Sequence, residues 1–454
     1  MARASRVKAD AFSLARAAPV ARHPVLTRSR TASIVTLAVE SSRSSAVTRR
    51  AAWLGLAVLT LINLLNYLDR NVVPPLGESL RTSTLHVTDP QFGALASAFI
   101  LVYMATAPAF GVLGDRGSRP RLIALGVGLW SVATMLGGLA SSYGWLLGAR
   151  AAVGIGEAAY GSIAPALLAD YFPDHQRSRV FAVMYMAIPV GSALGYVVGG
   201  AMDAHFGWRS AFFVAGAPGL LLALIALGLL DPPRGAQDHV GASGAATRSR
   251  GFAAYLDVAR IREYRHTVFG YAAYTFATGG IAAWMPTFLV RERHLSSQSA
   301  SVTLGAVLVV TGFAGTFAGG WLADALHRRM PNANLVVSGV TTLLAAPLAY
   351  VALSSADHSV YWPALAAAEV LIFMSTGPIN SAIVDAVPAA MRASAMAASI
   401  FTIHILGDVP SPYLIGSLSS RVGLAHAVLL VPAAVLVAGV WWIYAASVRP
   451  PRAE

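Results

Sequence analysis

Two related stretches organise the sequence: Gly111-Val-Leu-Gly114-Asp115-Arg116-Gly117-Ser118-Arg119-Pro120-Arg121 in its first half and Gly320-Trp-Leu-Ala-Asp324-Ala-Leu-His327-Arg328-Arg329 in its second. Each follows a long apolar segment directly and combines glycine with an aspartate and several basic residues. Glycine permits close helix approach and a tight turn, while the charged side chains need water or each other. The matched positions indicate an internal duplication, in which each half of the chain carries its own copy of a polar loop.

The composition places most of the chain in lipid. Of the 454 residues, 56% are hydrophobic and 12% are charged, whereas soluble domains carry about 25% charged residues. The net charge of +12 would suggest nucleic acid as the partner of a soluble protein, but basic residues also gather in the cytoplasmic loops of membrane proteins, so no nucleic-acid partner is expected. Cysteine is absent, which excludes disulfides and Cys-based metal sites.

Apolar segments long enough to cross a bilayer recur along the chain, and a helical crossing takes about 20 residues. Unpaired backbone groups cannot face lipid, and the ten-residue alternation of a membrane barrel is missing. The sequence therefore predicts an all-α membrane protein with twelve transmembrane helices in two six-helix, pseudo-symmetric bundles. The predicted spans are 53–80, 91–114, 120–141, 143–171, 176–204, 208–231, 264–290, 298–325, 333–354, 359–386, 390–418 and 423–447.

Charge and composition divide the chain into five regions. Residues 1–52 are Arg-rich and acid-poor and predict a disordered cytoplasmic tail; a transit peptide and a mis-assigned start codon are the alternatives. Residues 53–231 and 264–447 form the two predicted bundles, and 448–454 form a second cytoplasmic tail. Residues 232–263 predict a cytoplasmic linker that ends in a surface helix or is solvated throughout. The basic residues lie mostly in alternate connections, which predicts that both termini are cytoplasmic.

The two polar loops predict a gate at the cytoplasmic rim. An aspartate there can pair with arginines and accept hydrogen bonds from a helix N-terminus of the facing half. Such a latch would break and reform as the halves rock, and the alternative is a basic loop with a helix cap. The predicted gating residues are Gly111, Asp115, Arg116, Arg119, Asp324 and Arg328.

These loops resemble the signature of the major facilitator superfamily, a Gly, Asp, Arg, Gly, Arg pattern between the second and third helices. Further matches are Arg150 with Gly154, the stretch Pro189-Val-Gly191-Ser-Ala-Leu-Gly195 with Gly199-Gly200, and Phe206-Gly207-Trp208-Arg209. The resemblance covers residues 53 to 447. It implies the major facilitator fold, whose two halves share a binding site at their interface.

A narrower resemblance is to the spinster family of that superfamily. Its animal members are proton-linked or facilitative lipid transporters, with sphingosine 1-phosphate and lysophospholipids as the known substrate class. The resemblance implies a lipid-like substrate for this chain, whose preference for Arg over Lys is typical of a bacterial protein. The stretches that carry it are Asn66-Tyr67-Leu68-Asp69-Arg70, Gly154-Ile-Gly156-Glu157-Ala-Ala-Tyr160 with Pro165, Ala187-Ile188-Pro189-Val190-Gly191-Ser192, and His404-Ile-Leu-Gly407-Asp408-Val-Pro-Ser411-Pro412.

Two carboxylates lie deep inside predicted spans. Asp69 lies about sixteen residues into the first span and Glu157 about fourteen into the fourth, approached from the opposite side, so their depths agree. Charged groups in the membrane interior are costly unless paired or hydrated, and a carboxylate in such a site can exchange protons near neutral pH. We expect both to couple transport to protons, and a permanent ion pair is the structural alternative.

Two arginines accompany these carboxylates. Arg150 precedes Glu157 by seven residues, which returns it to within about 20° of the same helix face. Arg70 follows Asp69 directly, so their side chains diverge by about 100° and Arg70 should reach a different carboxylate or the substrate. We expect Arg150 to bind an anionic head group or to hold a carboxylate until substrate competes, with permanent structural pairing as the alternative. For Arg70 the alternative is a side chain that lies among helix dipoles and water.

A second group of substrate-binding candidates surrounds them. His404 and Asp408 lie four residues apart, within pairing reach, although Gly407, Pro410 and Pro412 equally indicate a bent, hydrated helix. Aromatic residues could contact an acyl chain or head group, with packing as the alternative. Those chosen are Tyr103, Tyr185, Tyr274 and Trp284, while Glu369 has no evident partner.

The predicted function is proton-coupled secondary transport of an amphipathic small molecule by alternating access, in a multi-pass protein of the cell inner membrane. The alternatives are a proton-driven exporter of drugs or hydrophobic metabolites, a membrane enzyme, and a transporter-derived sensor. No nucleophile–base set, metal cluster or nucleotide loop stands out, so we expect no enzyme, metal or cofactor. The expected partners are the substrate, protons and the bilayer, and the expected state is a monomer.

Overall fold

The computed structural model describes residues 48–234, 236–237, 252–327, 329–388 and 391–448, and within them every regular element is a helix. Thr88 and Gln91 form a reciprocal cap at the start of α4, and Gly207, with φ of 80°, separates α7 from α8. The first half comprises α2 (Arg49–Val72), η1 (Pro74–Leu76), α3 (Gly77–Thr82), α4 (Asp89–Arg116), α5 (Arg119–Gly138), α6 (Tyr143–Tyr171), α7 (Asp174–Phe206) and α8 (Trp208–Ala226).

The second half begins with a short helix, α9. It lies at the end of the predicted linker, where the sequence predicts either a surface helix or a solvated segment. Two of its long helices are interrupted, one after Phe373 and one by a π-helical turn. Its elements are α9 (Phe252–Arg260), α10 (Arg262–Arg293), α11 (Ser297–His327), α12 (Ala333–Ser354), α13 (His358–Phe373), α14 (Thr376–Asp385), α15 (Arg392–Ile403), η4 (His404–Asp408), α16 (Pro410–Val422), α17 (Leu424–Ala427) and α18 (Leu430–Val448).

Ten helical segments of the described chain are long and apolar enough to cross a membrane. Two predicted spans are not among them: α10, which carries several tyrosines and threonines, and the interrupted α15 to α16 segment. The predicted all-α membrane architecture is confirmed, while the count of twelve crossings stays a prediction. The first predicted span is longer than expected, since it begins at Arg49 and continues through η1 and α3.

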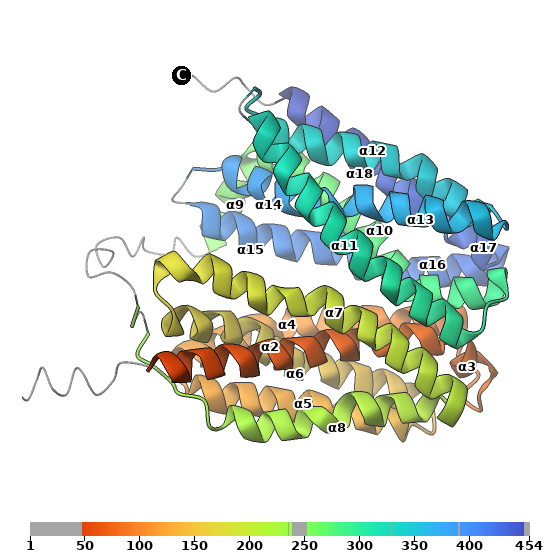
Figure 1. The fold of residues 1–454 in the computed structure, drawn as a ribbon, viewed down its shortest axis with the longest axis horizontal. Helices are drawn as coiled ribbons and strands as arrows, with labels where there is room; N and C mark the ends of the chain where they lie inside the picture. The colour runs from red at the N-terminus through yellow and green to blue at the C-terminus, as the bar shows by residue number, and fades with distance from the viewer. Residues whose placement is uncertain (1–47, 235, 238–251, 328, 389–390, 449–454) are drawn as a thin grey trace, which may run out of the picture. The chain divides into compact units, whose positions relative to one another are not determined.

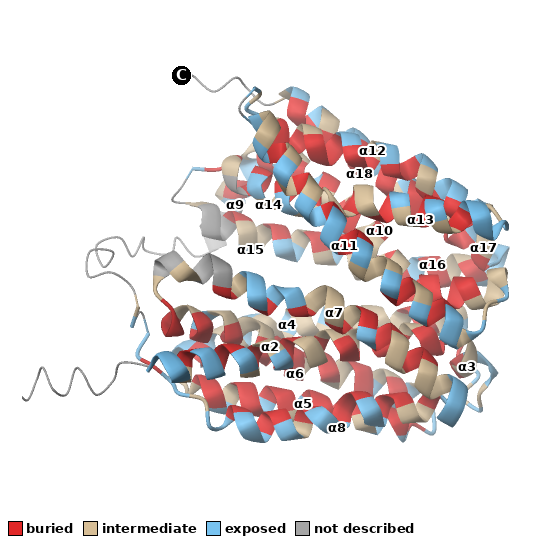
Figure 2. Cartoon of the chain, viewed as in Figure 1, coloured by how far each residue is buried: buried red, intermediate tan, exposed pale blue. Residues whose placement is uncertain are grey.

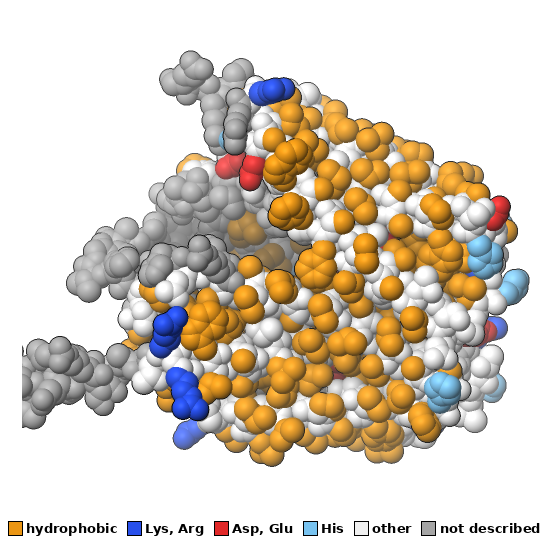
Figure 3. Space-filling model, viewed as in Figure 1, with side chains coloured by type: hydrophobic (Ala, Val, Ile, Leu, Met, Phe, Trp, Pro, Cys, Tyr) orange, Lys and Arg blue, Asp and Glu red, His pale blue; other side chains and the backbone are white. Residues whose placement is uncertain are grey.

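The helices pack in two groups (Figure 1). In the first group, α2 packs on α7, both α4 and α5 pack on α6, and α5 also packs on α8. In the second group, α10 and α12 pack on α18, and α13 packs on α11 and α12. Figure 2 shows buried residues between neighbouring helices and exposed ones on the outer faces of α8 and α11. Those outer faces carry large apolar side chains such as Leu224, Phe317 and Trp321, which suits contact with lipid (Figure 3).

The two groups meet mainly through α7 with α11 and α4 with α16. A methyl group on Gly305 of α11 would lie 3.1 Å from the carbonyl oxygen of Ala193 on α7. On the other side, Trp284 of α10 donates its indole N–H to the carbonyl of Pro412, whose backbone faces Gly93 of α4. Small residues therefore let the helices of the two groups approach closely.

Close approach also holds the first group together. A methyl group on Gly156 of α6 would lie 2.5 Å from the carbonyl oxygen of Gly126 on α5 and 2.6 Å from the backbone nitrogen of Trp130. A methyl group on Gly148, two turns earlier on the same helix, would meet nothing within 4 Å. The glycine before Glu157 therefore sets the spacing between α5 and α6.

We expect Gly156→Ala to destabilise the protein by about 1–3 kcal/mol, because the added methyl group must displace backbone atoms of α5. Thermal unfolding in detergent, followed by size-exclusion chromatography of the fraction that stays monodisperse, measures this loss. Gly148→Ala is the matched control and should leave the unfolding temperature unchanged or slightly higher. Equal effects of the two substitutions would contradict the packing argument.

Candidate functional site

A cavity of about 610 Å³ lies between the two groups of helices and is lined by residues of both. The first group contributes side chains from α2, α4, α6 and α7, and the second from α10, α15, η4 and α16. Figure 3 shows the surface hollowed between the two groups on this face of the molecule. The cavity is large enough for a drug-sized molecule.

Asp69 is completely buried next to this cavity. Its carboxylate accepts a hydrogen bond from Arg150 Nη1 at 3.1 Å and another from the hydroxyl of Thr134 on α5. Arg150 is 3% exposed and also stacks over Phe99, with its guanidinium carbon 5.2 Å from the ring centre. The first predicted proton-coupling residue is thus held by one of the predicted arginines.

Glu157 is also completely buried, and it pairs with the other arginine. Arg70 Nε lies 2.6 Å from Glu157 Oε2, while Glu157 Oε1 has no hydrogen-bond partner among the described residues. Arg70 is the more exposed partner, with 26% of its side chain accessible. A buried polar atom without a partner is costly, and each pair has one, since Nε of Arg150 also has no hydrogen-bond partner among the described residues.

The two ion pairs cross between α2 and α6. Asp69 and Arg70 are neighbours on α2 and diverge, while Arg150 and Glu157 share one face of α6, so each helix offers one charge of each sign to the other. Four charges are thereby neutralised in two pairs. Removing one member of such a buried pair leaves an unpaired charge, which costs about 3–5 kcal/mol.

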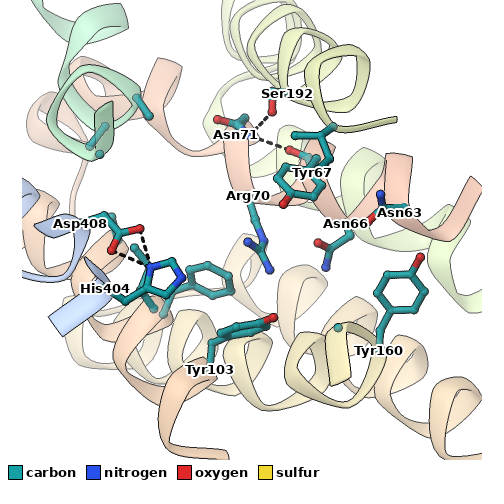
Figure 4. A pocket seen from close by; sticks show the side chains of 18 of the residues that line it. Asn63, Asn66, Tyr67, Arg70, Asn71, Tyr103, Tyr160, Ser192, His404 and Asp408 are labelled. Atoms are coloured by element: carbon teal, nitrogen blue, oxygen red, sulfur yellow. Dashed lines mark hydrogen bonds and ion pairs between the residues drawn. The ribbon is translucent and has the colours of Figure 1, made fainter. Parts of the chain in front are cut away.

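Aromatic rings surround the guanidinium of Arg70. Its central carbon lies 5.0 Å from the ring centre of Tyr67, 5.2 Å from that of Phe99 and 5.1 Å from that of Tyr103. Figure 4 shows Arg70 reaching into the cavity between α2 and the ring of Tyr103. The cavity therefore presents a cation that is stabilised by ring faces and still accessible.

His404 and Asp408 lie across the cavity from Arg70 (Figure 4). Nδ1 of His404 is 2.9 Å from both carboxylate oxygens of Asp408, and both residues belong to the π-helical turn η4. The π turn separates α15 from α16, as the glycine and prolines of this stretch predict. The π turn therefore combines the two expected features of this stretch, the pairing of His404 with Asp408 and a bend in the helix. It places this polar pair at the wall of the cavity.

The predicted aromatic residues divide into two pairs. Tyr103 and Tyr185 line the cavity, but Tyr274 and Trp284 do not. Both of these are buried in the second group: Tyr274 donates its hydroxyl to the carbonyl of Ile372, and Trp284 donates its indole N–H to Pro412. The prediction that they line the site is wrong for this conformation, because helical position alone could not separate a cavity face from a packed face.

The predicted gating residues do not form a latch between the halves here. Asp115 and Arg116 are exposed at the end of α4, and Asp324 is exposed near the end of α11. Gly111 lines a cavity of about 250 Å³ within the first group, and Arg328 lies outside the described residues. No ion pair of Asp115 or Asp324 occurs among the described side chains.

Arg119 corrects the gating prediction most clearly. It is 2% exposed, and its guanidinium lies 2.5 Å from Asp170 of α6 and 2.8 Å from Asp231, with a further bond to the carbonyl of Pro232. All of these partners belong to the first half of the chain. Arg119 therefore fastens the start of the predicted linker to α5 and α6, a role that spacing along the chain could not show.

An ion network at the opposite end was missed by sequence reasoning. Arg291 of α10 binds both carboxylate oxygens of Asp89 at 2.8 and 3.1 Å and Oε2 of Glu78 at 3.1 Å. Asp89 also accepts a hydrogen bond from Ser419 of α16. This Arg291 network joins α3 and α4 of the first half to α10 and α16 of the second. The available signal was the set of charges at Glu78, Asp89 and Arg291, which lie in or beside two connections expected on the same side of the membrane.

A polar stripe along α2 was also missed. Asn63, Asn66, Tyr67, Arg70 and Asn71 line the cavity, and their spacing repeats every three or four residues as on one helix face. The signal was visible in an otherwise apolar span. Among the described residues no three His, Asp or Glu side chains converge as a metal site would require.

Known proteins resemble this chain in sequence. Residues 59–407 match the Major Facilitator Superfamily. The spinster protein of Drosophila melanogaster is 33% identical over 397 residues, which cover 85% of this chain but only 64% of that protein. Spinster homolog 3 of Danio rerio is 35% identical over 395 residues, covering 83% of this chain and 78% of its own. Spinster homolog 1 of Homo sapiens is 34% identical over 383 residues, covering 80% and 72%.

Solved structures agree on the fold. A bacterial homologue of the human lysosomal transporter Spinster, in an inward-facing and unoccupied conformation, superposes with a TM-score of 0.77 at 24% identity, covering 88% of this chain and 96% of the other. The nucleoside transporter NupG superposes with a TM-score of 0.69 at 13% identity, covering 86% and 98%. Sequence and fold together show that this chain is a multi-pass membrane transporter that belongs to the spinster family of the major facilitator superfamily.

Proposed function

We propose that the chain is a proton-coupled secondary transporter of an amphipathic, lipid-like anion such as a lysophospholipid or a sphingosine 1-phosphate-like molecule. The observation that carries this proposal is the pair of crossed ion pairs, Asp69 with Arg150 and Arg70 with Glu157, buried beside a cavity shared by both halves. The crossed pairs supply two protonatable groups and one accessible cation, Arg70, in one place. Identity of about one third to spinster proteins supports the family, and the substrate class is what the resemblance to that family implies.

Proton binding and substrate binding are linked through the arginines. When Glu157 takes up a proton, its pairing with Arg70 weakens and the guanidinium becomes free to bind an anion in the cavity. Protonation of Asp69 would release Arg150 in the same way. The reverse also holds, since an anionic head group on Arg70 leaves Glu157 unpaired and favours its protonation.

The cavity walls suit an amphipathic molecule. Arg70 with its ring faces and the His404–Asp408 pair offer polar contacts from opposite sides. Apolar residues such as Phe99, Ile188 and Ile400 line the space beside them. A phosphate or carboxylate on Arg70 would leave an alkyl chain to lie along these residues, with the aromatic side chains excluding water.

Alternating access would use the two ends of the molecule. The Arg291 network holds the halves together at one end, while Asp115 and Asp324 are exposed and unlatched at the other. This is the arrangement of an inward-facing state. The protein would lie in the inner membrane of the cell, with the Asp115 end and both termini in the cytoplasm. In the opposite state, Asp115 and Asp324 would each pair with basic groups or a helix N-terminus of the facing half, and the Arg291 network would open. A monomer suffices for this cycle, because one chain supplies both halves.

Transport in proteoliposomes tests the proposal. Lysophosphatidylcholine, lysophosphatidylglycerol, sphingosine 1-phosphate, a nucleoside and a cationic dye should be compared with and without a proton gradient. We expect flux of lysolipids or sphingosine 1-phosphate that the gradient accelerates, and Asp69→Asn should abolish that acceleration because the amide cannot exchange protons.

Asp203→Asn is the control, because this substitution on α7 removes the same charge. Asp203 accepts a hydrogen bond from Ser79, away from the cavity. This variant should retain gradient dependence. Unchanged coupling in Asp69→Asn would refute the assignment of Asp69 as a proton-coupling residue. Flux of the dye without competition by lysolipids would instead favour a broad exporter of hydrophobic compounds.

The Arg291 network makes a separate prediction about gating. Loss of a charged hydrogen-bond partner costs about 1.5–3 kcal/mol, so Arg291→Gln should shift the equilibrium toward opening of this end by about tenfold or more. Spin labels at Thr82→Cys and Ser420→Cys, one on each half, measure this by pulsed electron resonance, and the chain contains no native cysteine.

Arg293→Gln provides the matched control for this measurement. Arg293 lies two residues further on α10, but it donates to the carbonyl of Leu353 and stacks on Phe288, all within the second half. Its replacement should leave the distance distribution between the labels unchanged. If both variants gave the wild-type distribution, the Arg291 network would not be a gate.

A further inference from the structure

A group of basic and aromatic side chains lies on the outside of the second half, apart from the transport cavity. On α10, Arg262, Arg265, His266 and Phe269 follow the spacing of a single helix face. Arg262 and Arg265 are exposed at the start of the helix, and Phe269 is 46% exposed about two turns further. At 1.5 Å per residue the charged and apolar ends of this face are about 10 Å apart.

The neighbouring helix α18 completes the group. Arg262 Nη2 lies 3.2 Å from the hydroxyl of Tyr444, and the ring of His266 packs edge-on against Tyr444 at 5.1 Å. Trp441 packs against both His266 and Phe269, at 6.0 and 6.3 Å between ring centres. Trp441 and Tyr444 are themselves exposed on the outer surface.

The order of chemical groups along this face follows the depth of a membrane leaflet. Arginines lie at the helix end, hydroxyl, indole and imidazole groups follow, and an exposed phenyl ring lies deepest. Nδ1 of His266 is buried and has no hydrogen-bond partner among the described residues. None of the six residues lines the 610 Å³ cavity.

We infer that this outer face of α10 and α18 is a binding site for an anionic phospholipid of the bilayer. The guanidinium of Arg262, oriented by Tyr444, and the neighbouring Arg265 would hold the phosphate. Trp441 and His266 would face the glycerol and ester region, and the acyl chain would lie along Phe269. The charge of the two arginines selects an anionic over a zwitterionic head group, and the site is independent of what the transporter carries.

Native mass spectrometry of the purified full-length protein, titrated with phosphatidylglycerol or phosphatidylcholine, tests this site. The wild type should bind one phosphatidylglycerol at least tenfold more tightly than phosphatidylcholine. The double variant R262Q/R265Q should lose about tenfold in affinity for phosphatidylglycerol. R262K should lose severalfold, because lysine keeps the charge but not the planar fork that matches a phosphate.

Arg121→Gln is the control for charge alone, since Arg121 is exposed at the start of α5 in the first half. It should bind phosphatidylglycerol as the wild type does. If R121Q and R262Q/R265Q lost affinity for phosphatidylglycerol equally, the effect would come from overall charge, and the proposed site would be overturned. Wild-type affinity in R262K, or equal binding of the two lipids, would overturn it as well.

Discussion

Ionised side chains inside a bilayer must be paired or hydrated, and the crossed pairs between α2 and α6 satisfy this requirement at the centre of the molecule. Asp69 and Glu157 are completely buried, and each is held by an arginine from the other helix. Close packing of α6 against α5 and α4 through Gly156 and Gly154 brings the charges into position. The cavity then opens beside Arg70, the most accessible of the four charged residues, so electrostatics and packing locate the site together.

The same constraint explains why the two ends of the molecule differ. At one end Arg291 satisfies Glu78 and Asp89, and this pairing holds both halves together. At the other end Arg119 satisfies Asp170 and Asp231 within the first half alone. A network that crosses the interface resists separation of the halves, whereas one inside a single half does not. The proposed cycle therefore depends on whether each arginine pairs with a carboxylate of its own half or of the other half.

Helical periodicity in the sequence predicts part of this site well. The 100° divergence of Asp69 and Arg70 predicted that Arg70 would reach another carboxylate or the substrate, and in the structure it pairs with Glu157. The glycine and prolines around Gly407 predicted the interruption at η4. These features are local, because helix geometry sets them before any tertiary contact forms.

Features that depend on tertiary contacts were predicted less well. Trp284 lies on α10 at a depth suited to a binding site, but it packs against Pro412. Arg119 stands in a loop motif expected to face the other half, yet its partners lie within its own half. Arg291 binds Asp89 and Glu78 of the first half, and no motif in the sequence marks it. Each outcome depends on how helices that are distant in the sequence pack together. The spacing of residues along one helix carries no information about that packing.

The most direct test of the account asks whether the crossed pairs convert proton binding into motion of the halves. Spin labels at Ser118→Cys and Ser447→Cys report the separation of the halves at the Asp115 end, in a chain without native cysteine. The account predicts a wild-type distance distribution that changes between pH 5 and pH 8, and a distribution independent of pH in D69N/E157Q. A pH-dependent change that persists unaltered in D69N/E157Q would contradict it.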